Sequence, residues 1–227
     1  MFALLLCAAF LDPRELIEKA IAVEKQNLPE RSRYFAREEI RVTRSEGGQR
    51  KQLSLRTFEA MVVEGRVRYR QVARDGKPLK AGERKLQPEG KRAGLKMRQV
   101  LEYHDLEFAG SESIEGRAAW HVRTRPRATA PRAGSQEDLA LLGPMDLWID
   151  EVTGQERKLR LVVERPWGPW TKATTLETWS VRLDRLFVAA RSLVRRPIGK
   201  SVIETDQVYS DYKRFSSEAV VTFTPEP

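Results

Sequence analysis

The sequence predicts a mainly β (α+β) protein, in which one helix precedes a single antiparallel meander and one basic excursion interrupts it. Three observations predict this arrangement. Apolar residues follow helical spacing only near the start of the chain, they alternate with polar residues over many later runs, and tight turns join most of those runs. No strand–helix–strand alternation occurs, which argues against a doubly wound nucleotide-binding sheet.

The helix is predicted from Asp12-Pro13, because Asp is a favoured N-cap and Pro is favoured at the first helical position. Four apolar residues then follow at helical spacing: Leu16, Ile17, Ala20 and Val23. The helix is expected to end at residues 27–29 (NLP), since Pro cannot continue a helix without losing a backbone hydrogen bond.

The remaining pattern indicates about nine or ten short strands. Gly47-Gly48, Glu64-Gly65, Asp75-Gly76, Glu115-Gly116 and Thr153-Gly154 are the expected turns. The clearest alternating runs are residues 34–42, 52–63, 66–73, 106–109, 117–125, 145–150, 159–163, 172–181, 184–195 and 201–212. Residues 77–101 carry Gly, Pro and many basic residues, and we interpret them as a lid or loop with short helical pieces.

The charge is concentrated in one part of the chain. The net charge is +9 over 227 residues, and residues 31–98 hold 20 Lys and Arg against 8 Asp and Glu. On one face of the strand at 66–73, Arg66, Arg68 and Arg70 form a stripe, and Val67 and Tyr69 lie on the other face. A sheet that reads nucleic acid places aromatic rings among its arginines, so we expect no nucleic-acid partner. An anionic membrane surface is the expected partner of the stripe, with a solvated outer face as the alternative.

The first residues resemble a signal peptide. Residues 2–11 (FALLLCAAFL) form an apolar run that is too short to span a bilayer, and small residues in it offer a cleavage point. We therefore expect residues 1–11 to be a signal peptide and residues 12–227 to be one exported domain of the cell envelope. Cys7 is the only cysteine, so the expected mature chain forms no disulfide.

No catalytic constellation appears in the sequence. His104 and His121 are the only histidines, which excludes a histidine-rich metal site and the HExxH motif. Gly199-Lys200-Ser201 imitates the end of a P-loop, but Val194 stands where the motif requires Gly. We therefore expect a protein that is not an enzyme and needs no cofactor or metal.

Three segments resemble the LolA/LolB-like superfamily of outer-membrane lipoprotein-sorting proteins. Residues 70–79 (RQVARDGKPL) resemble its passage from strand to lid, residues 115–120 (EGRAAW) and 145–150 (MDLWID) its central hairpins, and residues 208–215 (VYSDYKRF) its closing strand. The resemblance implies an antiparallel half-open β-barrel covered by helices, located in the periplasm. It also implies that the concave apolar face binds a lipid or a lipoprotein acyl chain.

The expected ligand-binding residues are those whose side chains share the apolar face of the sheet: Val67, Tyr69, Trp120, Val122, Met145, Leu147, Ile149, Leu159, Leu161 and Val163. The alternative is that these residues pack only on one another and on the helix. A competing function is an envelope protein–protein interaction or sensor module with a filled barrel. A pocketless interior would favour that module, and an apolar cavity would favour a carrier or chaperone. In either case we expect a monomer.

Overall fold

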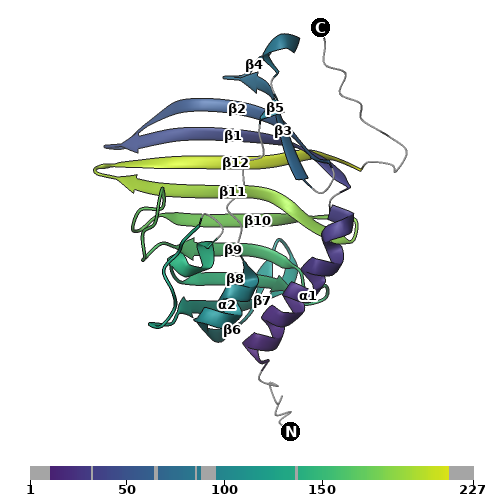
Figure 1. The fold of residues 1–227 in the computed structure, drawn as a ribbon, viewed down its shortest axis with the longest axis vertical. Helices are drawn as coiled ribbons and strands as arrows, with labels where there is room; N and C mark the ends of the chain where they lie inside the picture. Colours follow the sequence, from purple (N-terminus) through teal and green to yellow (C-terminus); the bar gives the residue numbers. More distant parts are fainter. Residues whose placement is uncertain are drawn as a thin grey trace, which may run out of the picture.

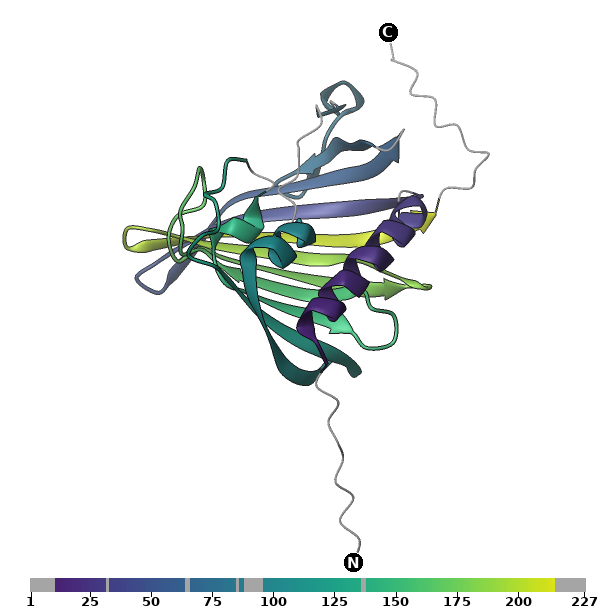
Figure 2. The same cartoon turned by 60° about the horizontal axis from the view of Figure 1, so that its bottom comes forward.

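The protein is a curved antiparallel sheet with two helices on its concave side (Figures 1 and 2). This computed structural model describes residues 11–31, 33–63, 66–84, 86–87, 96–135 and 138–214, and of residues 61–63, 66–68 and 86–87 it describes the backbone only. Residues 1–10 of the expected signal peptide lie outside the described residues. So do residues 88–95 of the expected lid.

The helices and strands follow one another along the chain with few long connections. Their bounds are α1 Pro13–Arg31, β1 Tyr34–Glu46, β2 Gln49–Val63, β3 Arg66–Arg74, β4 Lys77–Pro78, the 3-10 helix η1 Ala81–Glu83, β5 Leu86–Gln87, α2 Met97–Tyr103, β6 His104–Ile114, β7 Arg117–Pro126, the 3-10 helix η2 Leu139–Leu142, β8 Met145–Asp150, β9 Glu156–Val162, β10 Thr175–Leu183, β11 Leu186–Ile198 and β12 Ser201–Arg214.

The sheet is open. Its strand order is β4-β3-β2-β1-β12-β11-β10-β9-β8-β7-β6, with β5 paired to β3, and these neighbouring strands pair antiparallel. Along this order β1 pairs with β12, so the first and last strands lie side by side in the middle of the sheet. The half-open barrel with an N-terminal helix is confirmed, with twelve strands in the described chain rather than nine or ten.

Helix α1 lies diagonally across the ends of the strands (Figure 1) and buries Leu16, Ile17 and Ala20 against the sheet. It continues through Pro29 to Arg31, so the predicted end at residues 27–29 is wrong. Pro29 stands in the last turn, where its missing N–H removes only one intrahelical hydrogen bond. Packing of the first half of the helix stabilises it enough to offset that loss.

The main core fills the concave side over strands β6 to β10. It contains Val122, Leu147, Ile149 and Leu161, none of which has measurable exposure to solvent. The connection between β7 and β8 contains η2, and all four residues of η2 are buried. Apolar side chains of η2 therefore close one end of the core.

The outer, convex face is less solvated than the alternation of residues predicts. Strict alternation along the strands would place His121, Asp146, Trp148 and Asp150 on a solvated outer face, but His121, Trp148 and Asp150 are buried. His121 stacks on Trp148 at 4.6 Å between ring centroids, and the Lys158 ammonium lies 4.5 Å from the Trp148 ring. Rings and aliphatic stems thus cover one another on this face, which a strict two-residue period does not reveal.

Candidate functional site

A cavity of about 700 Å³ lies between α1 and the concave face of the sheet. This volume is in the range of small-molecule binding sites. Most of its wall is apolar or aromatic, with a few charged side chains. The wall consists of Ala20, Glu24, Leu28, Pro29, Arg31, Tyr34, Ala36, Ala60, Tyr69, Met97, Gln155, Glu156, Thr178, Trp179, Ser180, Phe187, Val188, Ala189, Tyr209 and Tyr212.

A second cavity of about 400 Å³ adjoins the first and extends toward β8 and β9. Six residues line both: Glu24, Met97, Glu156, Thr178, Ala189 and Tyr209. Trp170, from the turn after β9, lines the far part and packs against the main core. Because the two cavities share a wall, they form one groove beneath α1, which we call the groove.

The structure divides the predicted ligand-binding residues between the groove and the core. Four line the groove: Tyr69, Met145, Leu159 and Leu161. Val122, Leu147, Ile149 and Val163 are enclosed in the main core and Trp120 packs against it, as in the alternative stated above. Val67 lies in β3 with its side chain outside the described part. That all ten residues bind a ligand stays a prediction.

Glu156 is a carboxylate that the sequence reasoning missed. It faces the groove because of a β-bulge: Trp148 pairs with Lys158 but Ile149 pairs with Glu156, so Arg157 is the extra residue. Glu156 is half-buried and lines both cavities of the groove. Burial first, and then the nearby Glu24 carboxylate, raise the pKa of Glu156 to about 7, while the Arg31 guanidinium opposes the shift.

The bulge itself is held by buried polar contacts. The Gln155 side chain accepts a hydrogen bond from the Phe187 N–H at 2.9 Å and donates one to the Arg185 carbonyl at 3.0 Å. The buried Arg157 guanidinium lies 4.8 Å from the Phe187 ring and 3.9 Å from an Asp150 oxygen. Gln155 and Arg157 therefore fix the backbone on both sides of Glu156.

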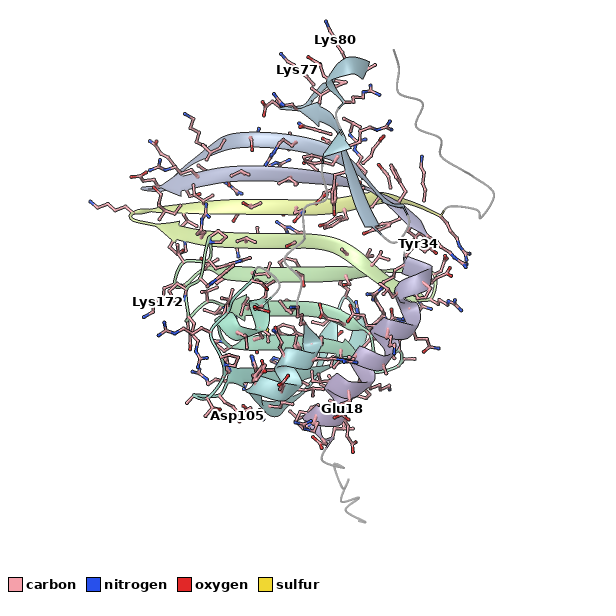
Figure 3. All side chains as sticks on the ribbon, in the orientation of Figure 1. Glu18, Tyr34, Lys77, Lys80, Asp105 and Lys172 are labelled. Atoms are coloured by element: carbon pink, nitrogen blue, oxygen red, sulfur yellow. The ribbon has the colours of Figure 1, made fainter. Side chains whose placement is uncertain are left out.

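Two other charged side chains of the groove come from α1. Glu24 is exposed at the groove edge, and Arg31 is half-buried at the end of the helix. The Arg31 Nε is buried and has no hydrogen-bond partner among the described residues. Tyr34, which is labelled in Figure 3, also lines the groove, and its hydroxyl donates a hydrogen bond to Asp184 at 3.1 Å. Burial, followed by this contact, raises the pKa of Tyr34.

The predicted arginine stripe is placed only in part. Arg70 donates from its Nε to Glu59 at 3.0 Å, which shields much of its charge. Arg66 and Arg68 belong to β3, and their side chains lie outside the described part. Beyond β3, Lys77 and Lys80 are exposed and project away from the sheet (Figure 3). A docking role for this basic end stays a prediction.

Both histidines hold structure together in the described chain. His104 is buried, with Nε2 2.8 Å from the Ala140 carbonyl and Nδ1 2.9 Å from the Thr124 hydroxyl. His121 has Nδ1 2.8 Å from Glu112 and Nε2 2.8 Å from Asp146. In the part of the chain that the structure describes, no three His, Cys, Asp or Glu side chains gather as metal ligands do. Nor is any helix in that part long and apolar enough to cross a bilayer.

Comparison with known proteins gives structural similarity only. No family model matches the sequence, and no curated protein matches it. Among solved structures, a DUF1329 family protein from Desulfovibrio piger shares 12% identity with a TM-score of 0.44, covering 92% of this chain and 95% of that one.

Two further structures come from the superfamily that the sequence motifs resemble. An outer membrane lipoprotein-sorting protein domain from Vibrio parahaemolyticus, described as putative in its name, shares 11% identity with a TM-score of 0.42, covering 90% of this chain and 95% of that one. A LolA superfamily protein from Nitrosomonas europaea shares 11% identity with a TM-score of 0.40, covering 90% and 94%. At such values the function has to be argued from the groove itself.

Two kinds of sequence signal mark the groove residues that sequence reasoning missed. Ala20, Ala36, Ala60 and Ala189 are small residues at inward positions, where large ones would fill the interior. Glu156 is a charged residue on the face that otherwise carries Leu159 and Leu161. A period of two places Glu156 on the opposite face from Leu159, and only the bulge reverses this.

Proposed function

We propose that the groove binds the hydrophobic part of an amphiphile, such as a lipid or a lipoprotein acyl chain, and that the protein acts as a carrier or chaperone in the periplasm. The observation that carries the proposal is the apolar groove between α1 and the sheet, with its cavities of about 700 and about 400 Å³. Binding of this kind needs no reactive group, in keeping with a wall of Ala, Leu, Met and aromatic residues.

Burial of an acyl chain supplies enough free energy for this function. Each buried methylene contributes about 0.8 kcal/mol, so about 14 methylenes give a gross of about 11 kcal/mol before the cost of association. The sheet is curved (Figure 2), and the groove lies between its concave face and α1. Little structure therefore has to form on binding.

The competing function is a protein-interaction module with a filled interior. The filled part of the concave side, over β6 to β9, fits that description, but the groove beside it does not. Small residues along the groove wall argue against this alternative, since larger ones at the same positions would have filled the space.

A blocked groove tests the proposal. Ala189 lines both cavities, so Ala189→Trp places an indole in the groove. The substitution should weaken the binding of a fluorescent apolar probe, N-phenylnaphthylamine, by about tenfold or more. Ala118 is an exposed strand residue, and Ala118→Trp is the matched control that should leave probe binding unchanged. Equal probe binding by wild type and a folded Ala189→Trp variant would refute a ligand site in the groove.

A further inference from the structure

Glu156 and Arg31 carry opposite charges and line the groove, but they do not form an ion pair with each other. Among the residues that the structure describes, the side chains of Glu156 and Arg31 make no hydrogen bond and no ion pair within 4.0 Å. The fully buried carboxylate of Asp150, in contrast, accepts hydrogen bonds from the Thr153 N–H and hydroxyl, both at 2.9 Å. Glu156 and Arg31 are half-buried at the wall of a cavity, where a charge loses part of its hydration, so a ligand that brings the opposite charge into the cavity is favoured there.

We propose that the groove selects amphiphiles with a zwitterionic head group, in which an ammonium meets Glu156 and Glu24 and a phosphate or other anion meets Arg31. This inference rests on the proposed function and names the ligand class of the same site. Glu156 and Arg31 are close enough to affect each other electrostatically but too far apart to pair, which leaves room for a group that carries both charges.

The aromatic lining fits the cationic half of such a head group. Tyr34, Tyr69, Tyr209 and Tyr212 line the same cavity as the two carboxylates. Tyrosine rings attract an ammonium through their π faces, and more strongly where water is excluded. A purely anionic head would face the repulsion of Glu24 and Glu156, and an uncharged head would leave Glu156 and Arg31 unpaired.

Amphiphiles with one dodecyl chain and different heads test the proposal. Each is titrated below its micelle concentration, at pH 8, against bound N-phenylnaphthylamine. Dodecylphosphocholine should displace the probe at about one-tenth of the concentration that dodecyl maltoside needs, since charge-assisted contacts exceed neutral ones. Dodecyl sulfate and dodecyltrimethylammonium carry one charge each, so both should need a higher concentration than dodecylphosphocholine to displace the probe.

Matched variants separate head recognition from chain binding. Glu156→Gln should weaken dodecylphosphocholine about tenfold and leave dodecyl maltoside within about twofold. Arg31→Gln should weaken dodecylphosphocholine and dodecyl sulfate but not dodecyltrimethylammonium. Glu107→Gln, at an exposed strand carboxylate, is the control that should change nothing. Glu156→Gln removes a half-buried charge that has no ion-pair partner among the described residues, so its melting temperature should equal or exceed that of wild type.

Three results overturn the inference. These are no preference for dodecylphosphocholine, an equal effect of Glu156→Gln on all four amphiphiles, or equally strong competition by phosphocholine without a chain. Failure of the proposed function looks different: dodecyl maltoside would then not displace the probe at all, whatever the charged amphiphiles do.

Discussion

Stability of the fold should depend on pH through His104. Its ring is enclosed in the core between Thr124 and Ala140. A carbonyl oxygen only accepts, so Nε2 donates to Ala140. Burial favours the neutral ring, in which Nδ1 carries no proton and accepts from the Thr124 hydroxyl. Burial is the main cause that lowers the pKa of His104 from 6.5 to about 4.

The sign of the effect follows from this lowered pKa. The unfolded chain takes up the proton near pH 6.5 and the folded chain only near pH 4, so the stabilisation is complete above pH 6.5 and is lost as the pH falls toward 4. A difference of this size corresponds to about 3 kcal/mol in full, of which about 2.5 kcal/mol is lost between pH 7.5 and pH 4.5.

Urea unfolding at those two pH values measures the loss, and His104→Gln isolates it. The variant keeps a donor and an acceptor but does not titrate, so its free energy of unfolding should fall by about 2.5 kcal/mol less than that of wild type. The chain has two histidines, so NMR titration of the ring protons assigns the pKa directly by comparison with the variant. Equal losses for wild type and His104→Gln would refute the reasoning.

Two predictions concern the envelope. Binding to vesicles rich in anionic lipid should weaken steeply between low and high salt, and an Arg66/Arg68/Arg70→Gln triple variant should bind less tightly while it folds normally, because each basic residue contributes about 1 kcal/mol near an anionic bilayer. A solvated face without a docking role predicts no vesicle binding at low salt, which co-sedimentation detects. Sequencing of the native protein should find an N-terminus within residues 9–12, and an intact Met1 would contradict export.

Fold class could be predicted because the signals for it are local. Alternation and Gly turns identify strands one at a time, and Asp12-Pro13 identifies the start of α1. The end of α1 could not be predicted, since whether a helix passes through Pro29 depends on tertiary packing elsewhere in the helix. Pairing of β1 with β12 joins strands far apart in the sequence, and no turn specifies it.

The site was less predictable because it lies where the regular pattern breaks. The apolar alternation identified Leu147, Ile149 and their neighbours, which belong mainly to the filled core. The groove depends instead on Ala189 being small and on Glu156 being turned inward by the bulge at Arg157. A bulge is a property of two paired strands, so a single strand's sequence does not reveal it.

The two halves of the concave face differ in polarity, and this difference gives a bound amphiphile an orientation. Over β8 and β9 the face is apolar, with Met145 and Leu161 buried. Toward β12 and β1 it is polar: Gln207 lines the groove and its side-chain amide donates to the buried Glu38. The groove extends over both halves, and Glu156, at the start of β9, lines both of its cavities. A chain laid over the apolar half therefore brings its head group to the charged residues, so one geometry serves both the proposed acyl-chain binding and the head-group selection inferred from it.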